Sequence, residues 1–198
     1  MEYDSLFRIV MLFEFIIVIP IAAFYRIRSQ LTKEKLDRRQ EGLFLLIGIR
    51  VSGFFHMVGI VAFLIAPSNM YWSSLPLTLW LRWLGVAIAS VAMFLWIWTF
   101  HHLGKNLTDT VVTRKNHTLI TSGPYRWVRH PFYIAFLLLI LANTFTTANW
   151  FIFITGCLTF LLIFLRTRKE EANLILRFGD EYRTYMHRTG RFFPKIKL

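Results

Sequence analysis

Long apolar runs alternate with polar, basic segments along the chain. Three runs, at residues 6–25, 43–66 and 77–100, are about as long as the 20 residues that a helix needs to cross a bilayer. Two shorter runs follow at residues 132–142 and 150–165, and their length predicts a tight hairpin that leans or thins the membrane. The pattern therefore predicts an all-α integral membrane protein with five transmembrane helices, of which the last two form a C-terminal helical hairpin.

The basic residues between these runs alternate from one side to the other. Lys and Arg number six in residues 26–41, five in residues 101–130 and nine from residue 166 onward. The connecting segments at residues 67–76 and 143–149 contain none. Because cytoplasmic loops are rich in Lys and Arg, this alternation predicts a multi-pass protein with its N-terminus outside and its C-terminus in the cytoplasm.

The polar tail after the last run has the periodicity of a helix. Its apolar residues recur at helical spacing, at Leu174, Ile175, Phe178, Tyr182 and Tyr185. Gly179 is a helix stop, and a second short helix is expected from Asp180. We therefore expect cytoplasmic tail helices that follow the hairpin.

Composition agrees with a membrane protein. Of the 198 residues, 56% are apolar and only 17% are charged, whereas soluble domains carry about 25% charged residues. These values exclude intrinsic disorder, a disulfide-rich secreted module and an ordinary cytosolic enzyme. The net charge of +12 suggests nucleic acid at first sight, but the basic residues lie between apolar runs rather than on one soluble face. We therefore expect the bilayer as a partner and no nucleic acid.

Residues 117–133 form the densest candidate site. Gly123 and Pro124 indicate a turn, and Pro131 fits the first turn of the fourth helix, where its missing N–H has no cost. Arg129 and His130 then flank a helix N-terminus, which attracts anions such as the anionic groups of a cofactor. The alternative is an interfacial belt of Tyr, Trp and Arg that anchors the helix.

A second candidate lies where the fifth helix leaves the bilayer. Arg166 and Glu170 are four residues apart and share a helix face, and Glu171 follows directly. The Arg can bind a carboxylate through a bidentate pair, while Glu170 orients it or faces a positive charge on a ligand. The alternative is a solvated surface ion pair.

Three ionisable residues fall inside apolar runs, namely Glu14, Arg50 and His56. Such residues are costly in a membrane and usually have a partner or a function. We interpret them as a structural contact of Glu14 with His56 or with Arg50, between the first two helices. A role in substrate binding is the alternative.

In their order and spacing the C-terminal motifs resemble those of the isoprenylcysteine carboxyl methyltransferase family. The matching elements are Gly-Pro-Tyr125, Arg129-His130-Pro131-Phe-Tyr133, residues 166–171, Phe178-Gly179-Asp-Glu-Tyr182 with Tyr185, and Pro194. The likeness extends over about residues 100–198, and the five-span form looks like the compact prokaryotic members. The same pattern also looks like phospholipid N-methyltransferases and other small membrane methyltransferases.

The resemblance implies S-adenosylmethionine as the methyl donor, bound at the cytoplasmic face. The residues that it implies for the cofactor site are His117, Thr118, Leu119, Ile120, Tyr125, His130, Pro131, Phe132 and Tyr133. Arg166 corresponds to the arginine that holds the substrate carboxylate, and Glu170 to the glutamate near the cofactor. We therefore divide the chain into a three-helix N-terminal membrane region, residues 1–100, and a cofactor-binding and catalytic region, residues 101–198.

Three functions remain open from the sequence. The first is a membrane methyltransferase that esterifies the carboxylate of a prenylated cysteine or a similar lipophilic acid. The second keeps the cofactor and changes the acceptor to a lipid amine or a small thiol. The third is a non-enzymatic carrier or assembly factor. We expect no metal, because the six histidines are dispersed. The sequence does not indicate the oligomeric state.

Overall fold

The computed structural model describes residues 3–30, 42–104 and 118–195, which are mainly helical. The long helices are α1 (Asp4–Gln30), α2 (Leu43–Ile65), α3 (Leu79–Leu103), α4 (Pro131–Thr147), α5 (Trp150–Phe178) and α6 (Asp180–Arg188). Two short 3-10 helices, η2 (Pro67–Ser73) and η4 (Gly123–Arg126), precede α3 and α4. In the described ranges, β pairing is limited to isolated bridges. The all-α prediction is confirmed.

Four helices are long and apolar enough to cross a membrane, namely α1, α2, α3 and α5. The predicted fourth span corresponds to α4, which has 17 residues and is about 25 Å long, a little short of the about 30 Å hydrocarbon core. It is longer than its apolar run predicted, because the run of Asn and Thr after Ala142 continues the helix. In α4, the hydroxyls of Thr144 and Thr147 donate hydrogen bonds to the carbonyls four residues earlier, so these polar side chains are satisfied inside the helix.

The hairpin between α4 and α5 is therefore tighter than the predicted segment 143–149. Only Ala148 and Asn149 lie between the two helices, and Ala148 adopts the left-handed conformation with φ 50° that starts the reversal of the chain. Asn149 then caps α5, since its side-chain oxygen accepts a hydrogen bond from the Ile152 N–H at 3.1 Å. Its amide nitrogen also donates to Ser73 Oγ at 2.8 Å, which joins the hairpin to η2.

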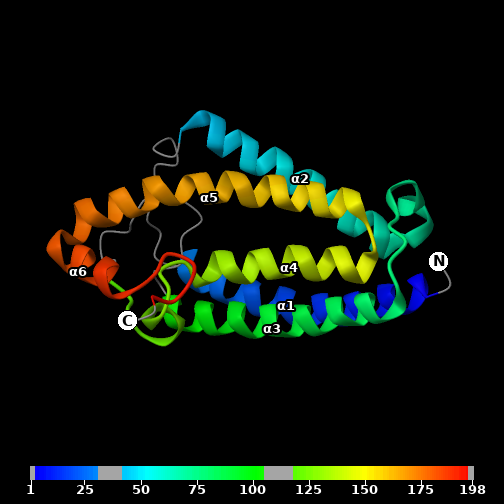
Figure 1. Ribbon diagram of the computed structural model, residues 1–198, viewed down its shortest axis with the longest axis horizontal. Helices are drawn as coiled ribbons and strands as arrows, with labels where there is room; N and C mark the ends of the chain where they lie inside the picture. The colour runs from blue at the N-terminus through cyan, green and yellow to red at the C-terminus, as the bar shows by residue number, and fades with distance from the viewer. Residues whose placement is uncertain (1–2, 31–41, 105–117, 196–198) are drawn as a thin grey trace.

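The helices form two closely packed pairs. α3 lies along α4, α2 lies along α5, and the contact between α4 and α5 joins the pairs (Figure 1). Glycines allow the close approach: a Cβ at Gly85 of α3 would lie 2.7 Å from the backbone nitrogen of Thr146, and one at Gly156 of α5 would lie 2.7 Å from Ile140. Such small residues at helix interfaces are typical of membrane bundles.

The membrane-embedded ionisable residues differ from the interpretation made above. The Nδ1 atom of His56 lies 3.1 Å from the Ile152 carbonyl oxygen and 3.4 Å from Thr155 Oγ1, so its partners lie on α5 rather than on α1. The link between α1 and α2 is instead made by Arg8, whose Nε donates to the Leu64 carbonyl at 2.7 Å. His56 therefore joins α2 to α5.

The two ends of the bundle differ in character. At the end that holds the N-terminus, the Arg82 guanidinium donates to Asp4 Oδ1 at 2.7 Å and to the Thr146 carbonyl from two nitrogens. At the other end, α5 runs unbroken past its apolar half to Phe178, Gly179 turns the chain with φ 55°, and α6 folds back beside η4 (Figure 1). The predicted helix stop at Gly179 is confirmed, and this end brings the sequence motifs together.

Candidate functional site

Tyr133 is the hub of a polar cluster between α4 and α5. It lies in the first turn of α4, which Pro131 begins, and it is buried. Its hydroxyl donates to Glu170 Oε2 at 2.6 Å and accepts from Arg166 Nη2 at 3.0 Å. Because Arg166 and Glu170 are one helical turn apart on α5, a single phenol oxygen joins the cation to the carboxylate.

His130 completes the cluster from the residue that precedes α4. Its ring stacks on Tyr133, with the centroids 5.3 Å apart and the planes at 11°. Its Nε2 lies 3.3 Å from Glu171 Oε1, and its Nδ1 lies 4.0 Å from Glu170 Oε1. Since an ionised carboxylate only accepts hydrogen bonds, Nε2 carries the proton in the contact with Glu171.

The two adjacent glutamates have different surroundings. Successive residues point about 100° apart around a helix, so Glu170 faces Tyr133 while Glu171 faces the chain segment before α4. Glu171 accepts from Arg129 Nε at 2.8 Å and from the Arg191 guanidinium, in addition to His130. The Glu171 side chain is only 4% exposed, whereas that of Glu170 is 28% exposed. Glu170 is thus the carboxylate that a ligand can reach.

The loop before α4 places Tyr125 close to this cluster. Tyr125 is buried, and its carbonyl accepts a hydrogen bond from the Tyr185 hydroxyl of α6 at 2.6 Å. Burial raises the pKa of Tyr125 well above its ordinary value, and the Glu170 carboxylate raises it further, so the phenol stays neutral. Gly123 starts this turn with φ 59°, and a Cβ there would lie 2.4 Å from the His102 ring, so only glycine fits.

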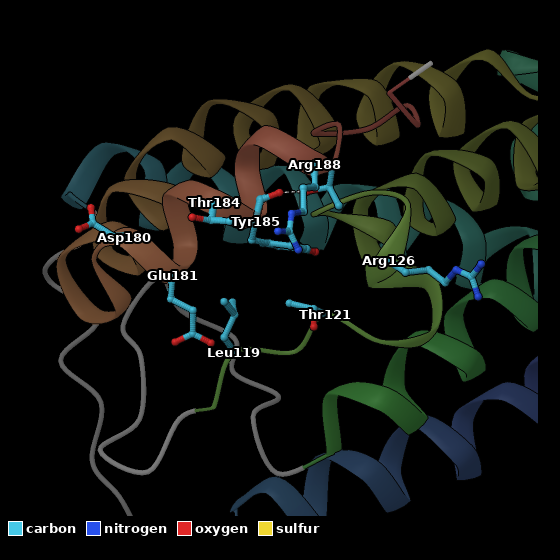
Figure 2. Close-up of a pocket in the computed structure, with 9 residues that line it drawn as sticks. Leu119, Thr121, Arg126, Asp180, Glu181, Thr184, Tyr185 and Arg188 are labelled. Atoms are coloured by element: carbon cyan, nitrogen blue, oxygen red, sulfur yellow. Dashed lines mark hydrogen bonds between the residues drawn. The ribbon is translucent and has the colours of Figure 1, made fainter. Parts of the chain in front are cut away.

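A cleft of about 550 Å³ opens beside the loop, between α6 and the segment that leads to η4 (Figure 2). Its lining residues are Leu119, Thr121, Arg126, Asp180, Glu181, Thr184, Tyr185, Arg188 and Thr189. The walls carry charges of both signs, and the volume is within the about 300–1,000 Å³ of small-molecule sites. A polar, zwitterionic ligand suits such a lining.

Four of the predicted site residues meet in one cluster, namely His130, Tyr133, Arg166 and Glu170. Pro131 is buried beneath them as the first residue of α4. Their roles in binding and catalysis stay predictions, since these contacts describe geometry.

The remaining predicted residues lie around this cluster. Leu119 lines the cleft, Thr118 beside it is exposed, and Ile120 is half-buried. Phe132 points toward α3, with its ring 6.0 Å from Trp96 and 5.6 Å from Phe100. His117 lies outside the described residues.

Three further residues join the site in the structure. The sequence placed Arg129 beside a helix N-terminus that attracts the anionic groups of a cofactor, whereas the structure pairs it with Glu171; Glu171 and Arg191 had been given no role. Arg129 and Glu171 are members of the motifs that were noticed, and their charges are the signal that could have paired them. Arg191, which also binds Glu171, lies in the tail with no motif of its own. Its partner is 20 residues away, which no helical spacing predicts.

Comparisons with known proteins agree with this geometry. Residues 83–176 match the family model described as the isoprenylcysteine carboxyl methyltransferase (ICMT) family. The human protein-S-isoprenylcysteine O-methyltransferase is 32% identical over 132 residues, which cover 65% of this chain and 46% of the human protein. The methanethiol S-methyltransferase of Pseudomonas deceptionensis is 32% identical over 120 residues, which cover 59% of this chain and 45% of that enzyme.

The fold is also similar to a solved structure, that of a eukaryotic intramembrane Ras methyltransferase of this family without a monobody. The TM-score is 0.50 at 21% sequence identity, over 76% of this chain and 52% of that chain. The chain thus spans about half the length of the relatives it matches. Together with the four long apolar helices, this fold makes the protein an integral, multi-pass membrane protein.

The segment that the family model matches carries the whole polar cluster. It begins within α3 and ends near the end of α5, so it includes His130, Tyr133, Arg166 and Glu170. The part of the chain that contains the polar cluster is therefore similar to the isoprenylcysteine carboxyl methyltransferase family.

Proposed function

We propose that this protein transfers a methyl group from S-adenosylmethionine to the carboxylate of a lipophilic acceptor, such as a prenylated cysteine, at the cytoplasmic face of the membrane. The observation that carries the proposal is the Tyr133 hydroxyl, which joins Arg166 to Glu170 beside His130. One cation for an anionic acceptor and one carboxylate for a cationic donor are what this reaction requires. The similarity of residues 83–176 to the isoprenylcysteine carboxyl methyltransferase family model supports the same proposal.

The residues fit the donor chemically. S-adenosylmethionine supplies, when bound, a methyl group on a positively charged sulfur. Glu170 is partly exposed and would face that charge, while the mixed-charge cleft at α6 would suit the ammonium and carboxylate of an amino acid. Of the residues predicted for the cofactor site, Leu119 lines this cleft, and the buried rings of His130 and Tyr133 lie stacked in the polar cluster.

Arg166 serves the acceptor in this proposal. A carboxylate is already nucleophilic at neutral pH, so the site must bind and orient it and remove its water rather than take a proton from it. The Arg166 guanidinium binds the acceptor carboxylate, and the hydrogen bond to Tyr133 fixes the guanidinium. Tyr133 thereby sets the distance between the acceptor and Glu170.

The cytoplasmic placement of the site follows from charge. The segments at this end of the bundle carry most of the Lys and Arg residues, while the segment 67–76 at the other end carries none. The donor then enters from the cytosol, and the acceptor arrives from the bilayer.

A small thiol is the second candidate acceptor. It is favoured by the likeness to a methanethiol S-methyltransferase, which is as identical to this chain as the human relative is. A lipid amine is a third acceptor of the same chemistry. Neither a thiol nor an amine needs a guanidinium partner, so Arg166 distinguishes the carboxylate from both.

Donor binding is tested by calorimetry on the detergent-purified protein with S-adenosylmethionine and S-adenosylhomocysteine. We expect micromolar dissociation constants, raised at least about tenfold in His130→Ala, which loses the stacked ring against Tyr133. His187→Ala, an exposed histidine of α6, is the matched control and keeps the wild-type affinity. Well-folded wild-type protein that binds neither compound would refute the methyltransferase.

Acceptor choice is tested by methylation of three probes, a synthetic N-acetyl prenylcysteine, methanethiol and phosphatidylethanolamine. We expect transfer to the prenylcysteine carboxylate, and for Arg166→Ala a KM for it raised about tenfold or more with donor affinity retained, since a charge-assisted bond is worth about 1.5–3 kcal/mol. Arg168→Ala, exposed on the same helix, is the control. Transfer to the thiol or the lipid alone, unaffected by Arg166→Ala, would replace the carboxylate as acceptor.

A further inference from the structure

The end of the chain forms a strap along the site. We call residues 189–195 the C-terminal strap, which follows α6 and runs parallel to residues 128–130. The Arg129 N–H donates to the Gly190 carbonyl at 2.9 Å, and the His130 N–H donates to the Arg191 carbonyl at 3.1 Å. The strap therefore holds the backbone of the residue whose ring stacks on Tyr133.

The strap is also bound to α6 by two cations. Arg129 donates to the Thr189 carbonyl at 2.5 Å and to the Met186 carbonyl at 3.3 Å, and Lys195 donates to the carbonyls of Met186 and His187 at 3.0 Å. Carbonyls in the last turn of a helix lack partners within the helix, and cations there are favoured by the helix dipole. These bonds fix where the strap begins.

Side chains of the strap then reach α5. Arg191 binds Glu171, and the Phe192 ring stacks on Phe164 with the centroids 5.4 Å apart and the planes at 25°. Phe164 and Glu171 are seven residues apart, two helical turns, so they share one face of α5. The Phe192 ring also lies 5.7 Å from His130, so His130 contacts the strap, α5 and Tyr133 at once.

From these contacts we infer that the C-terminal strap is a positioning element: Arg191 through Glu171, and Phe192 directly, hold the His130 ring against Tyr133 in the geometry that methyl transfer requires. The inference rests on the proposed function. The Glu171 carboxylate is sealed from ligands by its partners, so these residues act through His130 and do not touch the donor or the acceptor.

Charge makes Arg191 the informative member of the strap. Glu171 is buried and balanced by Arg129, His130 and Arg191 together. The Arg129 side chain is only 8% exposed, so its removal would destabilise the fold by breaking a buried ion pair. The Arg191 side chain is 34% exposed, so its replacement disturbs the fold less. Without Arg191, the Glu171 carboxylate keeps only its contacts with Arg129 and His130, so its position and that of the His130 ring are less fixed.

The test compares Arg191→Met, Arg191→Lys and Phe192→Leu with wild type in the full chain. Two properties are measured: hydrogen exchange of the peptide that holds the Arg129 and His130 amides, and the donor dissociation constant with kcat and KM. We expect Arg191→Met to speed the exchange and to raise the donor dissociation constant about tenfold, because the loss of a hydrogen bond to a charged group changes an equilibrium constant by about that factor. Arg191→Lys keeps the charge and recovers part of both effects.

Phe192→Leu keeps the ion pair and removes only the ring contacts, so it tests the strap if Arg191→Met folds poorly. Arg168→Gln is the control, since Arg168 is exposed on α5. We expect it to match wild type in both measurements.

Each outcome decides between the two claims. Faster exchange without any change in donor binding or kcat would make the strap a structural clasp only, and unchanged exchange in both strap variants would show that these side chains do not hold the motif. Either result overturns the positioning role while wild-type activity stands. Wild-type protein that neither binds the donor nor transfers a methyl group refutes the proposed function instead, and the positioning role falls with it.

Discussion

The hydroxyl of Tyr133 accepts a hydrogen bond from Arg166 and donates one to Glu170, so one atom aligns two opposite charges. Because the Tyr133 hydroxyl donates a hydrogen bond to Glu170, its oxygen becomes a better acceptor for the hydrogen bond from Arg166. Glu171, the next residue in sequence, has no part in this chain of hydrogen bonds and instead accepts a hydrogen bond from Arg191 of the C-terminal strap. At the residue scale, the geometry of the cluster therefore depends on which way each of two adjacent carboxylates points.

Tyr133→Phe removes this hydroxyl and leaves the ring that stacks on His130. We expect kcat/KM for methyl transfer to fall about 10- to 100-fold, because a hydrogen bond to a charged group contributes about 1.5–3 kcal/mol. The measurement is the steady-state methylation rate, beside the melting temperature in detergent, which should change little.

The control for this prediction is Tyr71→Phe, in η2 at the opposite end of the bundle. It removes the same atom from a tyrosine that is exposed, and should leave the rate unchanged. A wild-type rate in Tyr133→Phe would show that the shared hydroxyl does not align the two charges during the reaction.

At the scale of elements, the α3–α4 contact carries the helix that presents Tyr133. α4 is short for a membrane span, and α3 runs along it for much of its length (Figure 1). The approach is closest at Gly85, where backbone and side-chain atoms of Thr146 lie within 2.8 Å of an added Cβ. Backbone atoms cannot move aside as a flexible side chain can, so this position tolerates only glycine.

Gly85→Ala should push α3 and α4 apart and destabilise the protein by about 1–3 kcal/mol. The matched control is Gly53→Ala in α2, where the added Cβ meets only Thr159 Cγ2 at the ordinary distance of 3.9 Å. Alanine favours a helix over glycine by about 1 kcal/mol, so the control should be neutral or slightly stabilising. Thermal unfolding in detergent compares the two, and equal melting temperatures would contradict the close contact.

Over the whole molecule, the two ends have separate tasks. The end that holds Asp4, Arg82 and Asn149 ties α1, α3, η2 and the hairpin together with buried polar bonds. The other end has the partly exposed Glu170 carboxylate and the cleft at α6. One end thus maintains the bundle, and the other remains open to ligands.

Arg82→Met breaks the buried ion pair with Asp4 and removes the donors to the Thr146 carbonyl. We expect a loss of about 3–5 kcal/mol of stability, because the buried Asp4 carboxylate loses its guanidinium partner. Adding Asp4→Asn should recover part of it. Donor affinity of the protein that remains folded should not change, as calorimetry below the melting temperature will show; a large loss of affinity would mean that the two ends are coupled.

Several features were predictable from the sequence because the bilayer imposes them. Lipid cannot satisfy backbone N–H and C=O groups, so apolar runs of sufficient length must form helices, and the described helices follow those runs. The helix stop at Gly179 was predictable because its positive φ suits glycine. The length of α4 was underestimated, because threonines that bond within the helix look like loop residues.

The cluster was predictable only in part. His130, Tyr133, Arg166 and Glu170 were named from motifs, and each lies where two helices meet; the placement of Phe132 against α3 and the partners of His56 were not foreseen. Such contacts depend on the rotation of each helix about its axis. A membrane helix is apolar on every face, so its sequence does not indicate which face packs against a neighbour.

The sequence by itself determined the order of helices, the basic end and the residue types available for chemistry, since these depend on hydropathy, charge and local spacing. Only the tertiary structure decided that Tyr133 joins Arg166 to Glu170, that Glu171 is sealed, and that residues 189–195 return to hold His130. These pairings link residues 20 to 61 positions apart, so they arise from packing between elements and not from any periodicity along the chain.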